Sequence, residues 1–215
     1  MEKKPDFKAM STKAKIGYVW DYYKWHIIGT IAAVSFVCYT VHYYVTYREP
    51  LLNVIMLNCY DSYNTDNSGF YEFQETYGYD PEEYPISLAS FYLAEGDNAA
   101  SASYTDYQAL TTMIAAGGED LFFGTGDTYL TYCEQGALLD LSTILSPELM
   151  EEYNDCLIYS TSDGEVDPYP CAIELTGNDW LRKNNYYDTC YFGIFYSNQN
   201  LDACTQFAEF LLTYG

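Results

Sequence analysis

The chain of 215 residues is 49% hydrophobic and 19% aromatic, which is enough for one packed domain of ordinary size and a smaller segment. Its charge is uneven: six of the nine basic residues lie in the first 24 positions, whereas the part from Leu51 onward has 27 acidic and two basic residues, a net charge of −25. Such an acidic part repels nucleic acid and anionic lipid headgroups, so we expect neither as its partner.

An uncharged run from residue 27 to residue 47 separates the basic and the acidic parts. As a helix this run, IIGTIAAVSFVCYTVHYYVTY, spans about 30 Å, the thickness of a bilayer core. Aromatic residues flank it on both sides and lysines crowd only its amino-terminal side, which favours a membrane span with a cytoplasmic amino terminus. The alternatives are a cleaved signal peptide and a buried helix of a soluble domain.

We therefore expect a single-pass protein of the cell membrane. A basic cytoplasmic arm is expected at 1–25, a transmembrane helix at 26–47 and an extracytoplasmic domain at 51–215.

The elements expected after the apolar run alternate between strands and helices. Apolar or alternating runs predict strands at 51–60, 86–94, 119–124 and 190–197, and a hairpin-rich section at 156–175 with a turn at Asp163 and Gly164. The segment 70–78 is ambiguous. Strands interleaved with helices predict an α/β fold with a central sheet flanked by helices.

Four helices are expected in the same region, and their caps and spacing define them. One covers 104–117 with Tyr107, Leu110, Thr111 and Ile114 on one side, one begins at Asp127 and stops at Gly136, and one has Ser146 as its cap and Pro147 at its first position. The last, at 200–215, places Leu201, Cys204, Phe207, Ala208 and Leu211 on one face.

Six cysteines lie outside the uncharged run, namely Cys59, Cys133, Cys156, Cys171, Cys190 and Cys204. An even number of cysteines outside the cytoplasm permits three disulfides. Widely spaced cysteines without a C-x-x-C motif also behave as small buried hydrophobic residues. Disulfides and free buried thiols are therefore equal expectations.

The acidic part contains no histidine, since His26 and His42 lie in or beside the apolar run. This excludes Ser-His-Asp and Cys-His nucleophilic machinery and histidine-ligated zinc from that part. The phosphate-loop and nucleophile-elbow motifs are also absent from the sequence. We expect neither an enzyme nor a resident cofactor.

One segment, NTDNSGFYEFQE, matches the pattern of a twelve-residue calcium loop. Its oxygen ligands would be Asn64, Asp66, Ser68, Glu72 and Glu75, with Gly69 at the sharp turn. Hard oxygen ligands at alternate positions and a final bidentate carboxylate suit calcium. The same residue types are also common in polar turns that bind no metal, and that alternative stays open.

The chain has 26 tyrosines, which present a similar choice. A tyrosine ring offers a large stacking surface with a polar tip, as sugar and peptide sites use. The same side chains also pack in or over a hydrophobic core. The sequence alone does not tell which tyrosines would bind a ligand and which pack in or over the core.

From Leu51 onward, the order of elements resembles the first lobe of the extracellular solute-binding proteins of bacterial ABC importers. The resemblance rests on LLNVIML, TMIAAGG, EDLFFG, EQGALLDLS, DGEVDPYPCAIEL and FGIFYSNQNLDACTQFAEFLL, about 150 residues in patches. Only some twenty residues separate AIEL from CYFGIF, which leaves no room for a second lobe. The resemblance therefore implies a single lobe of this fold.

In that family the ligand lies between two lobes, near the carboxyl ends of the strands, and the general crevice rule for open α/β sheets agrees. The matching positions here are Tyr60, Asp61, Gly124, Thr125, Gly126, Asp127 and Tyr129. Alternatively, the sequence GTGD is only a strand-to-helix turn that Asp127 caps.

The resemblance implies a membrane-anchored binding protein that recognises a partner protein or a small ligand at the cell surface. Because half a cleft buries less of a ligand, a homodimer or a membrane partner would supply the second wall. The alternative function is an accessory or scaffold subunit of a membrane complex with no small-molecule ligand.

Overall fold

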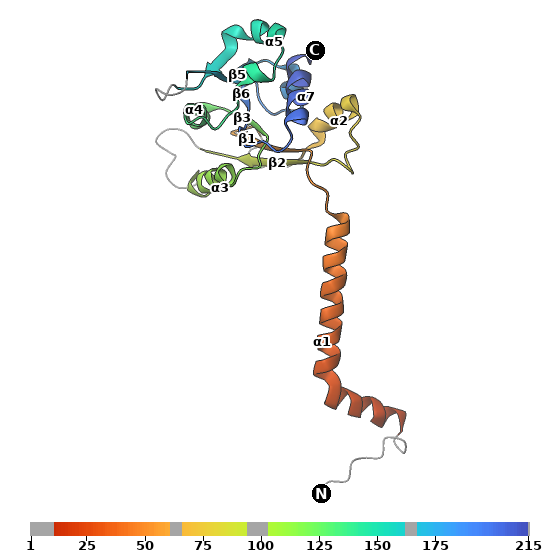
Figure 1. The fold of residues 1–215 in the computed structure, drawn as a ribbon. Coiled ribbons are helices and arrows are strands. Elements are labelled where there is room, and N and C mark those ends of the chain that lie inside the picture. Colours follow the sequence, from red (N-terminus) through yellow and green to blue (C-terminus); the bar gives the residue numbers. More distant parts are fainter. Residues whose placement is uncertain (1–10, 61–65, 94–102, 162–166, 215) are drawn as a thin grey trace. The chain divides into compact units, whose positions relative to one another are not determined.

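The structure, a computed structural model, describes residues 11–60, 66–93, 103–161 and 167–214. Its contacts divide the chain into two units, residues 1–47 and residues 48–215. The described part of the first unit is one helix, α1 (Thr12–Thr46), in which the stretch Trp20–Thr46 is long and apolar enough to cross a membrane (Figure 1). The predicted apolar helix is confirmed, and its length and composition suit either a membrane anchor or a signal sequence.

The second unit is an α/β domain built on a mixed sheet with the strand order β2-β1-β3-β6-β5-β4 (Figure 1). Strand β1 runs parallel to both of its neighbours, whereas β6 runs antiparallel to β3 and β5, and β4 antiparallel to β5. The strands are β1 (Leu52–Leu57), β2 (Ile86–Phe91), β3 (Leu121–Gly124), β4 (Leu157–Tyr159), β5 (Pro170–Thr176) and β6 (Thr189–Ile194). The predicted α/β class is confirmed, while the resemblance to one lobe of a solute-binding protein stays a prediction.

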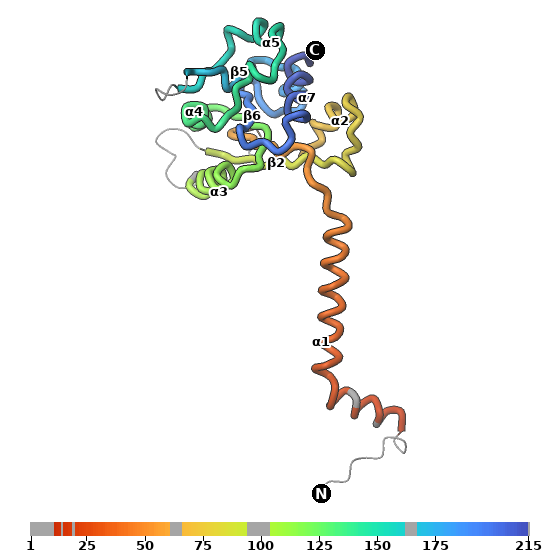
Figure 2. Tube along the Cα trace, in the orientation of Figure 1, coloured from red at the N-terminus to blue at the C-terminus, as the bar shows by residue number. Residues whose placement is uncertain are grey.

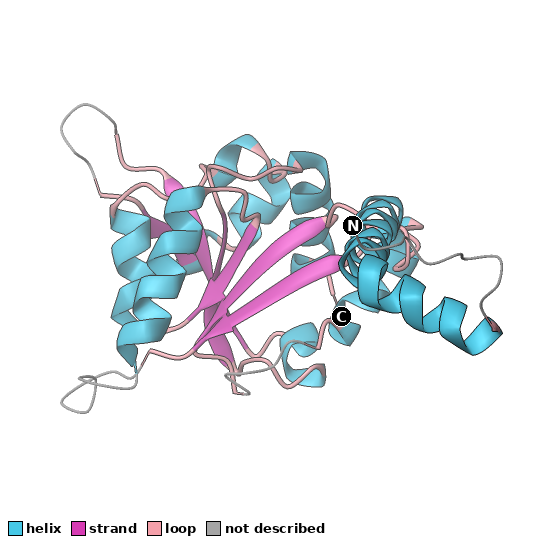
Figure 3. Ribbon diagram, turned by 90° about the horizontal axis from the view of Figure 1, so that it is seen from below, coloured by secondary structure: helices cyan, strands magenta, loops and turns pink. Residues whose placement is uncertain are grey.

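Helices lie on both sides of this sheet (Figure 3). They are α2 (Tyr71–Tyr77), α3 (Ser103–Ala116), α4 (Gly126–Glu134), α5 (Pro147–Glu152), α6 (Asp179–Lys183) and α7 (Leu201–Leu212), with single 3₁₀ turns at Ser68–Phe70, Leu141–Thr143 and Asn154–Cys156. The path of the chain between them can be followed in Figure 2.

Each face of the sheet carries its own hydrophobic core, because successive strand residues point to opposite faces. Along β1, Val54 and Met56 join the cluster beneath α7, whereas Ile55 and Leu57 join the cluster beneath α4. The α7 side is rich in aromatic rings, such as Trp180 and Phe207 with centroids 5.4 Å apart. Both faces are buried, as the continuous apolar run at 51–60 predicts for a central strand.

The start of α5 was predicted correctly. Ser146 caps α5 by accepting a hydrogen bond from the backbone N–H of Leu149, with Pro147 at the first helical position. Asn200 caps α7 in the same way, through the N–H of Ala203. Of the face predicted for α7, Leu201 is wrong: it is 44% exposed, because the first turn lies at the margin of the core and burial begins at Ala203.

Two other predictions need correction or completion. The N-cap position of helix α4 is Thr125, whose side chain makes no capping hydrogen bond, and not Asp127, which lies in the first turn. The ambiguous segment 70–78 is helical, and Gly78 ends α2 in the left-handed region with φ of 76°. The predicted turn at Asp163 and Gly164 lies outside the described residues.

All seven cysteines have free thiols in this structure. Five of the six in the domain are buried, and Cys156 is the exposed one.

Candidate functional site

The three parallel strands end level with one another, which brings several predicted site residues to one edge of the sheet. Leu57 at the end of β1 pairs with Phe91 of β2 on one side and with Gly124 of β3 on the other. We call the residues that follow these strands, 58–60, 92–93 and 125–127, the carboxyl edge. In open α/β sheets, ligand crevices form at this position.

Asn58 holds the carboxyl edge together. Its backbone lies in the left-handed region with φ of 58°, a conformation that asparagine tolerates better than most residues. Its N–H donates to the carbonyl of Phe91 at 2.8 Å, and its Oδ1 accepts from the N–H of Leu93 at 2.7 Å. The ends of β1 and β2 are thus tied by one residue.

Tyr60 lies at the surface of the carboxyl edge and is 59% exposed. Its side chain is hydrogen-bonded to Asp188, which raises the pKa of the phenol, so the hydroxyl stays neutral at physiological pH. Asp188 in turn pairs with Arg182, whose Nε lies 3.2 Å from Oδ1 of Asp188. The result is an exposed polar chain of tyrosine, carboxylate and guanidinium beside the end of β1.

The other predicted site residues fall into two groups. Thr125 and Gly126 are half-buried and Asp127 is exposed, so these three belong to the carboxyl edge. Asp61 lies outside the described residues.

Gly124 and Tyr129, by contrast, are buried in the hydrophobic core. A Cβ on Gly124 would lie 2.8 Å from Cβ of Leu57 and 2.9 Å from Cδ2 of Tyr129, so only glycine permits this approach of strand and helix. Tyr129 is fully buried, stacks on Phe122 with centroids 4.4 Å apart and donates from its hydroxyl to the Phe122 carbonyl at 3.3 Å. Neither residue reaches a surface where a ligand binds.

Three of the predicted calcium ligands, Asp66, Ser68 and Glu72, are hydrogen-bonded to protein groups. Asp66 accepts hydrogen bonds from the N–H and the hydroxyl of Ser68 at 2.9 and 3.0 Å. Glu72 accepts from Nζ of Lys183 at 2.7 Å and from the hydroxyl of Tyr214 at 2.9 Å, and these bonds lower the pKa of its carboxyl. Glu75 is exposed on α2.

Asn64 lies outside the described residues, and within the described ranges no three Asp, Glu, His or Cys side chains gather as metal ligands do. The calcium site stays a prediction.

The outer side of α3 was not predicted as a site, yet it exposes large side chains such as those of Tyr104 and Tyr107. Of the four residues predicted to share one side of this helix, only Leu110 is fully buried, and Tyr107 is 50% exposed. A shallow hollow of about 1090 Å³ runs along this side. We call its principal residues, Tyr104, Tyr107, Gln108, Thr112 and Met113, the α3 surface.

The α3 surface adjoins the carboxyl edge. A carboxylate oxygen of Asp106, in the first turn of α3, accepts a hydrogen bond from the backbone N–H of Tyr92 at 3.2 Å. Tyr92 and Tyr104 are themselves 45% and 64% exposed. Tyrosines spaced three apart at the start of a helix are the one sequence signal that pointed to this surface.

A second hollow, of about 510 Å³, opens where β5 ends, between the 3₁₀ turn at Asn154–Cys156 and the end of α7. Three carboxylates line it, those of Asp155, Glu174 and Asp179, together with the rings of Tyr153 and Tyr214. Its size falls within the range of small-ligand pockets, and its charge would suit a cation.

Comparisons with known protein families, with curated proteins and with solved structures found no match. The function therefore follows from the geometry of the site and not from a relative.

Proposed function

We propose that this protein is anchored in the cell membrane by α1 and binds a basic partner protein through the α3 surface of an extracytoplasmic domain. The observation that carries the proposal is the exposure of α3. A helix of this length is only marginally stable by itself in water and is normally held by burying a broad apolar stripe. Here a single residue, Leu110, is fully buried, while Tyr104, Tyr107 and Met113 line an open hollow.

Tyrosine and methionine suit the core of a protein interface. Both side chains provide large, adaptable contact areas, and tyrosine adds a polar tip that hydrogen-bonds to a partner. The hollow is wide and shallow, which fits a protein surface better than a small solute, whose sites are concave and enclose most of the ligand.

The chemistry of the partner follows from charge. Of the two basic residues after Leu51, Arg182 pairs with Asp188 and Lys183 with Glu72, so the domain offers its acidic side chains largely uncompensated. A field of this sign attracts a basic partner and opposes the pairing of two copies of the same domain. A membrane-embedded or surface protein with a basic face is the expected occupant.

The resemblance to a single solute-binding lobe is part of the same proposal. The level ends of β1, β2 and β3 support it, because ligand crevices in open α/β sheets form beyond such strand ends. The partner would then supply the missing wall next to the α3 surface.

Site-specific crosslinking in intact cells tests the proposal. A photo-crosslinking amino acid replaces Tyr104 in the full-length chain, and the matched control carries it in place of Tyr196, which is also exposed, at 74%. We expect one basic protein to be captured from position 104 and not from position 196. Tyr107→Ser should lower that yield by roughly fivefold, as removal of an interface anchor does.

Three outcomes would contradict the proposal: equal capture from both positions, capture of a second copy of this chain, or no capture at position 104. The yield from position 104 should also fall when membranes are crosslinked at high salt, since screening weakens attraction between opposite charges.

A small cationic ligand is the second candidate, and the acidic hollow at the end of β5 favours it. Thermal-shift measurements with amines and cationic amino acids would test this function, with Glu174→Gln as the variant that should abolish any shift. A shift that survives this substitution would place the ligand elsewhere.

A further inference from the structure

Helix α1 is longer than a membrane span requires. Its 35 residues would extend over about 52 Å in a straight helix, whereas the hydrocarbon core of a bilayer is about 30 Å thick. The uncharged run 27–47 is by itself long enough to cross that core. The first turns of α1, Thr12–Tyr22, are therefore left outside it, and we call them the leading segment.

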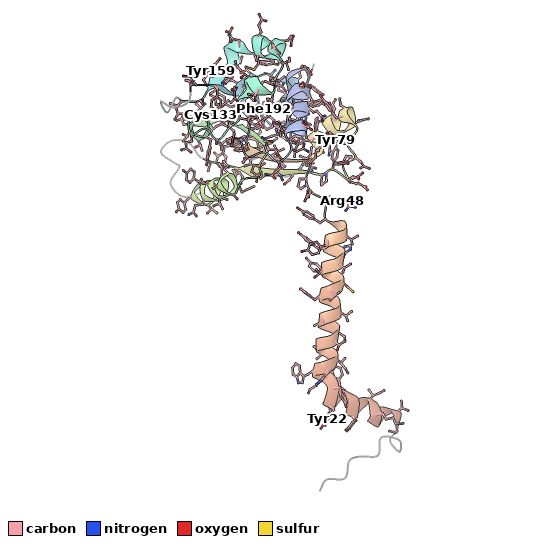
Figure 4. The ribbon with its side chains drawn as sticks, viewed as in Figure 1. Tyr22, Arg48, Tyr79, Cys133, Tyr159 and Phe192 are labelled. Atoms are coloured by element: carbon pink, nitrogen blue, oxygen red, sulfur yellow. The ribbon has the colours of Figure 1, made fainter. Side chains whose placement is uncertain are left out.

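The leading segment does not continue in the direction of the rest of α1. The helix bends near Tyr22, so that the leading segment points sideways from the part that follows (Figure 1 and Figure 4). Ile16 and Trp20 of the leading segment line a hollow of about 330 Å³ together with Ile27 from beyond the bend. In a straight helix Ile16 and Ile27 would lie about 16 Å apart along the axis, so a shared hollow places them on the inner side of the bend.

Apolar side chains follow this inner side. Ile16, Trp20 and Tyr23 recur at spacings of four and three, which puts them on one face of a helix, and they are 67%, 55% and 48% exposed. Tyr18 comes two positions after Ile16 and lies on the opposite face, where its ring stacks on that of Tyr22 with centroids 5.7 Å apart. The apolar face of the leading segment is therefore open and turned toward the inside of the bend.

Lysines flank the apolar face. Lys13 is three positions before Ile16 and Lys15 is one position before it, so their side chains emerge on the two flanks of that face. Asp21, the one acidic residue of the leading segment, lies away from it. Lysine stems of this kind lie along an apolar surface while their ammonium groups reach the polar layer beside it.

We propose that the leading segment lies along the surface of the bilayer and binds anionic phospholipid headgroups. Its apolar face rests at the boundary between acyl chains and headgroups, as in amphipathic helices that lie in the membrane plane. Lys13 and Lys15 pair with the anionic headgroups at its edges. The inner side of the bend is the side that meets the membrane, because the part of α1 beyond the bend is the span. The inference rests on the membrane anchoring proposed above.

Quenching of tryptophan fluorescence by brominated lipids tests this placement. With Trp20→Phe and Trp25→Phe, the full-length protein keeps one tryptophan, Trp180, which is buried in the domain. Ile16→Trp then introduces a reporter indole, and Tyr18→Trp introduces one in the matched control. Both proteins are reconstituted in phosphatidylcholine vesicles, with and without phosphatidylglycerol, whose acyl chains are brominated near the headgroups.

We expect strong quenching at position 16 and little at position 18 in the anionic vesicles, because only position 16 faces the acyl chains. Both leaflets have the same lipids, so the direction of insertion does not affect the result. Equal quenching at the two positions, or none at either, would overturn the inference alone if the protein stays in the vesicles through an alkaline carbonate wash. Release of the protein by that wash would overturn the anchoring as well.

Charge variants test the preference for anionic lipids. Lys13→Gln combined with Lys15→Gln should lower the ratio of docked to undocked segment on anionic vesicles by roughly thirtyfold, about fivefold for each lysine. Arg48→Gln, beyond the other end of the uncharged run, is the control and should leave the quenching at position 16 unchanged. Quenching at position 16 that is equally strong on phosphatidylcholine alone and survives the lysine substitutions would overturn the binding of anionic headgroups.

Discussion

Asp120 connects three segments that are far apart in the sequence. Its Oδ2 accepts from the N–H of Asn53 at 2.7 Å, and its Oδ1 accepts from the N–H groups of Gln199 at 2.7 Å and Asn200 at 3.3 Å. The carboxylate is buried, so no water molecule could accept the hydrogen bonds of these N–H groups in its place. It therefore joins the beginning of β1 to the turn that leads into α7.

Asp120→Asn should destabilise the domain by about 3 kcal/mol, because the amide turns a donor toward one of the three N–H groups and removes the charge that strengthens the remaining bonds. For a domain of this size the melting temperature should fall by about 6 to 12 °C, measured by circular dichroism. Asp127→Asn, at an exposed carboxylate, is the control and should change the melting temperature little. An unchanged melting temperature in Asp120→Asn would show that the Asp120 carboxylate does not stabilise the contact between β1 and the turn before α7.

The neighbouring Glu119 has the opposite effect on stability. Burial, with a smaller contribution from the charge of Asp120, raises the pKa of the Glu119 carboxyl in the folded state. The folded protein then binds this proton more tightly than the unfolded chain, so stability is lost as the pH rises through the range between the two pKa values.

Glu119→Gln should therefore raise the free energy of unfolding at pH 7, and the gain should vanish below about pH 4, where both states carry the proton. Denaturant titrations at the two pH values measure it. Glu75→Gln, at an exposed position, is the control variant in both titrations. If Glu119→Gln were less stable than the wild type at pH 7, the charged Glu119 carboxylate would not destabilise the folded state.

Among the longer helices of the domain, α3 is the one that buries a single residue fully in its described part. Leu110 is its fully buried residue, and Met113 and Ile114 are only partly buried against the same cluster. The helix is therefore attached to the sheet more weakly than α7, which buries seven residues.

Leu110→Ala should release α3 without unfolding the sheet, at a cost of about 3 kcal/mol to that helix. Hydrogen exchange should accelerate at the amides of α3 and stay slow at those of β1. Capture of the partner from position 104 should be lost at the same time. Thr112→Ala, on the exposed side of the helix, should leave the exchange of α3 unchanged, and global unfolding of Leu110→Ala would show that α3 is not a separate unit.

Elements with local signals could be predicted from the sequence, and long-range pairings could not. Ser146 and Pro147 define the start of α5 within two residues, and a continuous apolar run identifies β1. The insertion of β6 between β3 and β5 depends on residues some 70 and 20 positions away, and no local pattern encodes it.

The candidate site shows the same division. Level strand ends bring Tyr60 and Thr125 to one edge as expected, but Tyr129 turned out to be a core residue because a helical pattern does not reveal which side meets the sheet.

For the whole molecule, the proposed topology makes a prediction at Cys156. It is the exposed cysteine of the domain, so a membrane-impermeant maleimide should label it in intact cells. Cys156→Ser should remove the label. Labelling only after the membrane is permeabilised would place the domain in the cytoplasm.

The scarcity of basic residues has a consequence for proteolysis. After Arg48, trypsin finds only the adjacent sites Arg182 and Lys183, both on α6. One cut there divides the domain into two fragments, and the smaller one carries β6, whose hydrogen bonds to β3 and β5 lie within the sheet. The two fragments should elute together from a size-exclusion column and separate only in denaturant. The chain could therefore be divided at α6 into two fragments that reassemble.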